Sequence, residues 1–209
     1  GEVVFNTTLT GYQEVMTDPS YAGQIITFTT SHIGNYGATS LDSESRRTFA
    51  RGVIVRDMAR RHSNWRSETS LDEMLKKYEL PGIAGIDTRR LTRLLRDSGS
   101  LRGAFGTADE KSLLAAAQSD AGTAGIDLVS QVTTTEKYTF GSGKFSVVAY
   151  DFGIKTTILQ CLSEIATVTV VPAGTSAEEV MAMSPNGVFL SNGPGDPEMV
   201  RDATDNIRK

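Results

Sequence analysis

A sharp turn near residue 194 is the stretch of this sequence whose residue types and spacing best suit chemistry. The apolar residues 188–190 predict a short strand, and Asn192-Gly193-Pro194-Gly195 ends it at once. Glycine lets a ligand approach the backbone closely, and proline fixes its own φ. A rigid turn at the carboxyl end of a buried strand can aim backbone N–H groups into a crevice, where open parallel sheets bind ligands. An ordinary surface turn is the alternative that its composition leaves open.

Cys161 is the single thiol of the chain and so has to be weighed as a nucleophile. It lies in the middle of a predicted helix, in an apolar stripe with Ile154, Ile158, Leu162 and Ile165. A reactive thiolate is typically found at a helix N-terminus, beside a cation or within reach of a histidine. The pattern therefore favours packing in the core over catalysis for Cys161.

The other candidate side chains give weaker signals. His32 and His62 lie in polar loop sequence and are predicted to be exposed, and without a Cys/His cluster a structural zinc site is not expected. Asp151 follows a predicted strand, where it can contact a ligand or cap the next helix, and capping is favoured. The Gly193–Gly195 turn lacks both the P-loop ending and the spacing of a dinucleotide fingerprint.

Composition places the chain among globular proteins of the cytoplasm. Its 209 residues are 39% hydrophobic and 22% charged, which suits one large or two small domains. A net charge of −4 does not indicate binding to nucleic acid or to an anionic membrane. Neither a membrane-spanning run nor a secretory leader is predicted, and one cysteine fits a reducing compartment.

The first part of the chain has strand and helix signals in mixed order. Strands are predicted at 2–5, 24–29, 52–56 and 83–86. Capping boxes at 70–73 and 107–110 predict two helices, the first of which ends at Pro81.

Asp87 predicts the start of a further helix, which ends near Gly99. Its apolar face carries Leu91, Leu94 and Leu95. The opposite face carries Arg89, Arg90, Arg93 and Arg96, for which a solvated surface is favoured and a partner surface is the alternative.

The Thr- and Gly-rich segment 133–144 predicts a linker between two domains, at 1–140 and 145–209. Beyond it, strands at 147–150, 168–171 and 188–190 alternate with helices at 154–165 and after Ser176, which is half of a doubly wound α/β sheet. Half a sheet exposes an unpaired edge and an apolar face, and we expect a tendency to associate.

The blocks GEVVFNTTLTGYQEVMTDPSYAGQI, HIGNYG, GIDTRRLTRLLR, VVAYDFGIK and FLSNGPGDP occur in this order. Together they resemble the small subunit of carbamoyl-phosphate synthetase over essentially the whole chain. The resemblance implies an α/β fold, in which a mixed N-terminal α+β domain precedes the first βαβαβ half of a class I glutamine amidotransferase domain.

The resemblance also implies a function. The small subunit hydrolyses glutamine through a Cys thiolate, and ammonia passes to the large subunit. There ammonia reacts with bicarbonate and ATP, in the presence of Mg²⁺, to give carbamoyl phosphate for arginine synthesis, pyrimidine synthesis or both. The two subunits are expected to form a heterodimer in the cytoplasm. No cofactor or metal is expected on the small subunit itself.

Gly193 and Gly195 match glutamine-contacting glycines of the family, and the Gly193 N–H would be an oxyanion-hole donor. Thr8 stands where the family commonly has a serine that contacts glutamine. The family's Gly-x-Cys-x-Gly-His-Gln elbow and its triad His and Glu lie downstream of GPGDP, and no catalytic side chain is expected up to Lys209. The polypeptide alone is therefore expected to be inactive. A non-catalytic docking module for the large subunit and another class I glutamine amidotransferase are the alternatives, the latter disfavoured by the N-terminal blocks.

Overall fold

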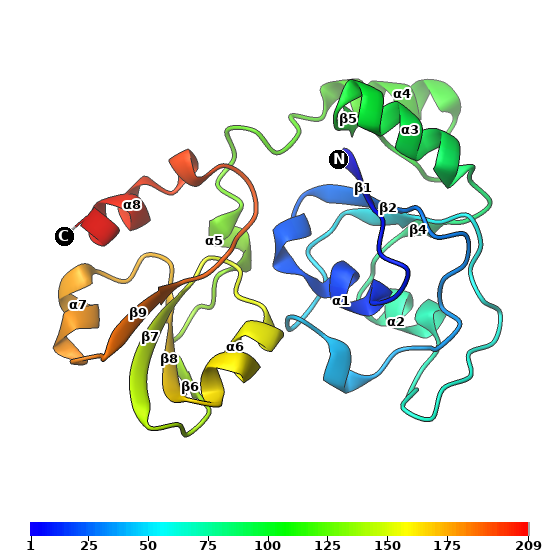
Figure 1. The fold of residues 1–209 in the computed structure, drawn as a ribbon. Coiled ribbons are helices and arrows are strands. Elements are labelled where there is room, and N and C mark those ends of the chain that lie inside the picture. The colour runs from blue at the N-terminus through cyan, green and yellow to red at the C-terminus, as the bar shows by residue number, and fades with distance from the viewer. Residues whose placement is uncertain (209) are drawn as a thin grey trace. The chain divides into compact units, whose positions relative to one another are not determined.

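A computed structural model of the protein describes residues 1–208, with the side chain of residue 202 left out, and the chain divides into two compact units (Figure 1). The first unit is Gly1–Thr123, and the second unit begins at Ala124. Each unit has its own sheet and its own hydrophobic core.

The first unit is built on a five-stranded mixed sheet in the order β4-β3-β2-β1-β5. Neighbouring strands among β1 to β4 pair in parallel, and β5 pairs antiparallel with β1. The strands are β1 (Glu2–Asn6), β2 (Gln24–Phe28), β3 (Gly52–Ile54), β4 (Gly82–Ile83) and β5 (Leu101–Arg102). Because parallel strands end at the same edge, the loops after β1, β2 and β3 share one edge of the sheet.

Helices cover both faces of this sheet, as Figure 1 shows. The helices are α1 (Tyr12–Thr17), α2 (Leu71–Lys77), α3 (Thr88–Ser98) and α4 (Glu110–Ser119). Ile26 and Val53 point to the core under α1 and α2, whereas Ile25 and Ile54 point to the core under α3. This alternation is the period of two that a strand imposes. Helix α4 has no buried residue.

Two of the three helix starts predicted for the first unit are confirmed. Ser70 and Glu73 form a capping box, with Glu73 N donating to Ser70 Oγ at 3.2 Å and Ser70 N donating to Glu73 Oε2 at 2.7 Å. Asp87 accepts from Arg90 N at 3.0 Å and caps α3. The box predicted at 107–110 is wrong, because Asp109 itself is the cap and accepts from Ser112 N at 3.0 Å.

The second unit is built on a four-stranded sheet in the order β6-β8-β7-β9. Its strands are β6 (Tyr138–Phe140), β7 (Phe145–Asp151), β8 (Ala166–Pro172) and β9 (Gly187–Leu190). The three strands β7, β8 and β9 are parallel, and α6 (Thr156–Ser163) and α7 (Ala177–Ala182) connect them. The predicted βαβαβ half of a doubly wound sheet is confirmed.

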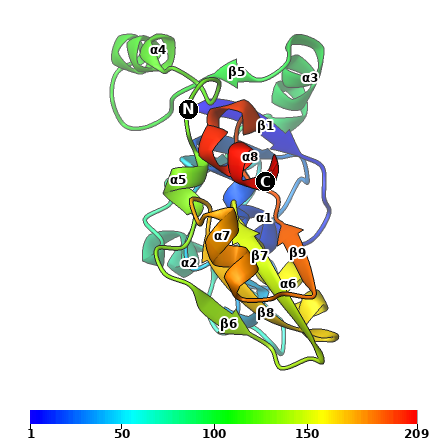
Figure 2. The same ribbon diagram turned by 90° about the vertical axis from the view of Figure 1, so that its left-hand side faces the viewer.

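Helices α6 and α7 lie on opposite faces of this sheet, with α7 in front and α6 behind in Figure 2. Ala149 packs in the cluster under α6 with Leu159, and Val148 packs with Val180 of α7. Burial of both faces explains why β7 reads as a continuous apolar run. Strand β9 is different, because it lies at the edge and its Val188 and Leu190 are 47% and 45% exposed.

The segment 133–144, predicted as a linker, contains strand β6, which pairs antiparallel with β8. Helix α5 (Val129–Val132) precedes it, with Val129 and Val132 buried in the second unit. The contacts of the chain thus place the change of unit at Thr123 and Ala124.

The remaining elements are short or terminal. They are the 3₁₀ turns η1 (Pro19–Tyr21), η2 (Ser40–Asp42) and η3 (Pro197–Met199), and the helix α8 (Arg201–Arg208). Among residues 1–208, no helix has the length and apolar character needed to cross a bilayer.

Candidate functional site

The Gly193–Gly195 turn follows β9 directly and is held against the turn that follows β7. A Cβ on Gly193 would lie 2.2 Å from Phe152 O, so only glycine fits there. Ser191 Oγ accepts from Phe152 N at 2.9 Å and donates to Asn192 O at 2.8 Å. Gly195 has φ of +74°, a conformation that favours glycine. These contacts fix the backbone of the turn.

The amides of Gly193 and Gly195 donate no hydrogen bond to any group that the structure describes. A hollow of about 160 Å³ lies beside them, lined by the turn, by Phe152 and by largely apolar side chains that include Val129 and Val200. Fixed backbone N–H groups beside an apolar wall can stabilise a developing negative charge. Among the side chains that the structure describes, no acid, base or thiol lines this hollow.

Asp151 organises the turn between β7 and α6. Its side chain is buried, and Oδ1 accepts from Gly153 N at 2.9 Å and from Ile154 N at 2.8 Å, while Oδ2 accepts from Thr134 N at 2.7 Å. The N-cap residue of α6 is Lys155, which makes no side-chain cap bond. The prediction that Asp151 caps the following helix is therefore wrong, because its carboxylate accepts from the amides of the turn that precedes α6.

Cys161 lies on the exposed side of α6, so its predicted packing in the core is wrong. The predicted stripe left out Leu159, which is the buried residue at the centre of the helix. Two residues along a helix correspond to a rotation of about 200°, which turns Cys161 away from that side. The helix also ends at Ser163, so Ile165 is outside it and 59% exposed. Cys161 lines no hollow described here.

Thr8 lies in the loop after β1, in the first unit. It is exposed, and both its N and its Oγ1 donate to Asn6 Oδ1, at 2.9 and 2.6 Å. Its hydroxyl is thereby oriented and keeps its lone pairs for a further donor. Thr8 thus belongs to one unit, and Gly193 and Gly195 belong to the other.

Two aromatic residues missed at the sequence level join the blocks around positions 12 and 36. The rings of Tyr12 and Tyr36 stack with centroids 4.2 Å apart. Tyr36 Oη accepts from Gly11 N at 2.6 Å, and Tyr12 Oη donates to Gly37 O at 2.5 Å. Burial raises the pKa of both phenols, so both stay protonated at neutral pH. They fix the loop that follows β2.

Gln13 and Glu14 beside them are also partly or fully buried. Gln13 Nε2 donates to Thr39 O at 2.5 Å, and Thr39 N donates to Gln13 Oε1 at 3.0 Å. Glu14 Oε2 is buried without a hydrogen-bond partner in the part of the chain that is described, and burial raises the pKa of this carboxyl. The sequence signal that could have identified these two residues is the pair of polar residue types at positions 13 and 14, in a helix that packs against the core.

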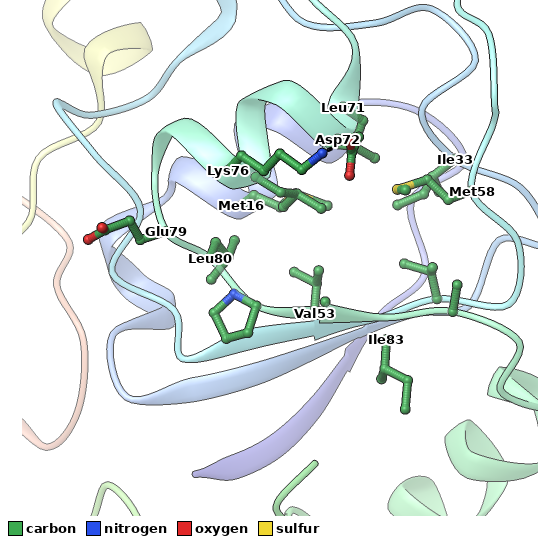
Figure 3. A pocket seen from close by; sticks show the side chains of 15 residues that line it. Met16, Ile33, Val53, Met58, Leu71, Asp72, Lys76, Glu79, Leu80 and Ile83 are labelled. Carbon is green, nitrogen blue, oxygen red and sulfur yellow. Dashed lines mark hydrogen bonds and ion pairs between the residues drawn. The ribbon is translucent and has the colours of Figure 1, made fainter. Parts of the chain in front are cut away.

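A second hollow, of about 340 Å³, lies between α2 and the sheet of the first unit. Figure 3 shows Leu71 and Lys76 on the helix side and Val53 on the strand side of it. Its polar lining consists of Glu79 and the exposed ion pair between Lys76 and Asp72. An apolar gap without converging donors suits no hydrolytic chemistry.

The two histidines are exposed as predicted, and His32 Nδ1 lies 3.3 Å from Asp57 Oδ2. Of the described side chains, no three from His, Cys, Asp or Glu are grouped so as to hold a metal ion.

Comparison with known proteins links the two units to one family. The family described as carbamoyl-phosphate synthase small chain, CPSase domain, matches residues 1–105. The family described as glutamine amidotransferase class-I matches residues 148–209, which include the Gly193–Gly195 turn.

Curated relatives are similar along nearly the whole chain. The carbamoyl phosphate synthase small chain of Pasteurella multocida (strain Pm70) is 50% identical over 215 residues, which cover 95% of this chain and 56% of the relative. That of Chlorobaculum tepidum is 50% identical over 214 residues, covering 100% of this chain and 58% of the relative. That of Pseudomonas aeruginosa is 48% identical over 230 residues, covering 100% and 61%.

The chain thus spans less than two thirds of the length of these relatives. The match to the first unit and the match to the parallel sheet with its glycine turn agree in order and in position. The protein belongs to the carbamoyl-phosphate synthase small chain family.

Proposed function

We propose that the protein is the glutamine-hydrolysing small subunit of a glutamine-dependent carbamoyl-phosphate synthase. The observation that carries the proposal is the Gly193–Gly195 turn at the carboxyl end of a parallel strand, where the amides of both glycines have no hydrogen-bond partner among the described groups. Family membership gives these amides a substrate class, namely the side-chain amide of glutamine.

In the proposed reaction the turn acts as part of an oxyanion hole. A Cys thiolate attacks the amide carbon of glutamine, the carbonyl oxygen becomes an oxyanion, and the Gly193 N–H donates to it. Collapse releases ammonia and leaves a thioester, which water then hydrolyses to glutamate. The clamp of Gly193 against Phe152 O holds the amide in place before charge develops, so little reorganisation is needed in the transition state.

Gly195 and Thr8 are proposed to contact the bound glutamine. The oriented Thr8 hydroxyl can accept a hydrogen bond from the amino or amide group of the substrate. The thiolate itself is assigned to the Gly-x-Cys-x-Gly-His-Gln elbow of the family, downstream of the turn. The polypeptide of residues 1–209 by itself is therefore proposed to be inactive, and Cys161 is not the nucleophile.

The ammonia is proposed to pass to a large subunit. ATP, bicarbonate and Mg²⁺ are assigned to that subunit, where carbamoyl phosphate forms for arginine synthesis, pyrimidine synthesis or both. We place this heterodimer in the cytoplasm, and we assign no cofactor to the small subunit.

Glutamate release by the complete small subunit with its large subunit tests the proposal. Gly193→Ala keeps the N–H but displaces it, because the added Cβ would lie 2.2 Å from Phe152 O, and it is expected to lower kcat by up to about 10²–10³-fold, the effect of losing an oxyanion donor. Thr8→Ala is expected to raise KM, whereas Thr8→Ser, which keeps the hydroxyl, is expected to restore it. Unchanged kinetics in Gly193→Ala would contradict the proposed role of the turn.

The second candidate function is a non-catalytic docking module. The compact first unit, which matches the synthase-specific domain, favours it. Capture of the 1–209 polypeptide by the large subunit without glutamate release would support docking for this stretch. Glutamate release by the purified 1–209 polypeptide would refute its proposed inactivity.

A further inference from the structure

A cationic cleft lies at the edge of the first sheet where β1, β2 and β3 end. It has a volume of about 650 Å³ and combines loop residues after these strands with one face of α3. The loops that follow the strands contribute Thr7, Thr29, Ser31 and Arg56. Helix α3 contributes Thr88, Arg89, Thr92, Arg93 and Arg96. The ends of parallel strands are a usual place for ligands in open sheets.

The helical spacing explains why these arginines come together. Arg89, Arg93 and Arg96 stand at i, i+4 and i+7, so they share one face of α3, and Arg56 joins them from the loop after β3. Arg90, which the sequence grouped with them, does not line the cleft. Leu95 and half-buried Leu91 are on the core side of α3.

No acidic side chain lines this cleft, although the whole chain has a net charge of −4. Arg96 is partly neutralised, because its Nη2 lies 2.8 Å from Asp97 Oδ1, and Arg93 interacts with the same carboxylate at longer range. Arg56, Arg89 and Arg93 form no ion pair with any acidic side chain that the structure describes. A local concentration of unpaired positive charge in a concave surface attracts anions.

The hydroxyl groups of the cleft add directional donors. Thr92 Oγ1 donates to Thr88 O at 2.7 Å, whereas the exposed hydroxyls of Thr7 and Ser31 make no hydrogen bond within the described part of the chain. Guanidinium groups bind oxyanions through paired N–H donors, and hydroxyls complete such a shell. The mixture suits a group with several oxygen atoms and more than one negative charge.

We propose that this cleft, formed by Thr7, Ser31, Arg56, Arg89, Arg93 and Arg96, binds the phosphate or polyphosphate group of a small solute. The proposal does not depend on glutamine hydrolysis, because the residues that line the cleft do not include Thr8, Gly193 or Gly195. Binding would exchange the hydration of the arginines for charge-assisted hydrogen bonds.

Calorimetric titration of the protein with inorganic pyrophosphate at low and at physiological salt tests the proposal. Saturable one-to-one binding is expected, weaker at the higher salt because screening reduces charge attraction. Arg93→Gln and Arg56→Gln are each expected to weaken binding by about tenfold or more, since each removes a charged hydrogen-bond donor. Arg90→Gln is the matched control, with the same charge change on the same helix, and is expected to change the Kd by less than about twofold.

A variant that is expected to tighten binding makes the test more specific. Asp97→Asn frees Arg96 and is expected to tighten pyrophosphate binding by a few-fold, whereas Asp72→Asn, which removes an equal charge beside Lys76, is expected to leave it unchanged. Circular dichroism and a melting curve verify that each variant is folded.

Absence of saturable binding up to about 10 mM pyrophosphate would overturn the proposal. Equal weakening by Arg90→Gln and Arg93→Gln would also overturn it, since it would show charge attraction without a site. Binding of polyglutamate that pyrophosphate cannot displace would assign the cleft to an acidic protein surface, and the small-solute proposal would then be wrong.

Discussion

The α-carbon of Gly193 and the carbonyl oxygen of Phe152 lie so close that a methyl group between them would be 2.2 Å from the oxygen. The glycine is thus required by packing within the second unit, whatever ligand binds outside it. This contact joins the end of β9 to the end of β7. A hydrogen bond from Phe152 N to Ser191 Oγ, at 2.9 Å, joins the same two strand ends. A rigid turn results, as an oxyanion donor needs.

Gly193→Ala is therefore expected to destabilise the protein even without substrate. The backbone has to move to relieve the contact, and overpacking of this kind costs about 1–3 kcal/mol. Urea unfolding measures the change. Gly187→Ala, in β9, is the control, because a Cβ there meets nothing within 4 Å, and its expected effect is below about 1 kcal/mol. Equal stability of the two variants would show that the Phe152 contact does not constrain the turn.

Asp151 is expected to be among the more sensitive positions of the second unit. Asp151→Asn leaves one oxygen for the Gly153 and Ile154 amides and turns an NH₂ group toward Thr134 N, so one buried donor loses its partner. We expect a loss of about 1–3 kcal/mol in the free energy of unfolding. Asp127→Asn, at an exposed carboxylate that accepts from Ser130 N at 3.0 Å, is the control and is expected to have the smaller effect.

Glu14 is expected to make stability fall as pH rises. Burial raises the pKa of its carboxyl above the usual 4.5, so the folded state holds the proton more tightly than the unfolded state. The folded protein therefore loses stability as pH rises from the unfolded pKa through the raised folded pKa. Glu14→Gln, which cannot ionise, is expected to be more stable than the parent at pH 7 and to lose this advantage in acid. Thermal unfolding from acid to neutral pH measures the difference.

Glu73, in the same unit, is expected to change stability with pH in the opposite direction to Glu14. The Ser70 amide and hydroxyl donate hydrogen bonds to the Glu73 carboxylate and lower its pKa. The stability that Glu73 contributes is therefore present above the unfolded pKa and is lost as pH falls through the folded pKa. Glu73→Gln is expected to be less stable than the parent at neutral pH, with the difference shrinking in acid. If Glu14→Gln and Glu73→Gln shifted stability in the same direction at pH 7, the unpaired burial of Glu14 would not be the cause.

Local signals predicted much of the fold. The apolar run at 147–150 is a strand buried on both faces, and Ser70 and Asp87 cap helices as their residue types predict. Long-range pairing was not predicted, because it leaves no local trace. The stack of Tyr12 on Tyr36 joins residues far apart in sequence. Strand β6 lies in the Thr- and Gly-rich segment 133–144, whose composition predicted a linker, and it pairs in register with β8.

The candidate site was predicted only where one turn contains it. Gly193 and Gly195 were found because their constraints are local, either a positive φ or a close backbone contact. Cys161 was misplaced because a single buried residue, Leu159, shifts the inward face of α6. Arg56 was missed as a member of the cationic cleft because only the parallel alignment of β1, β2 and β3 brings it to α3.

The open edge of the second sheet leads to the last prediction, that the 1–209 polypeptide associates with itself as its concentration rises. Val188 and Leu190 of β9 are 47% and 45% exposed, and they line a hollow of about 490 Å³ with Met181 and Ile207, which are 65% and 48% exposed. An edge strand with a contiguous apolar face favours pairing with another chain.

Sedimentation velocity over a range of concentrations measures this association. Leu190→Lys introduces a charge that would have to be buried in the contact, so it is expected to keep the polypeptide monomeric. Leu114→Lys is the control, because Leu114 is 56% exposed on α4, a helix without buried residues, and the change there is expected to leave association as in the parent. Association that persists in Leu190→Lys and disappears in Leu114→Lys would transfer the contact from the β9 edge to the first unit.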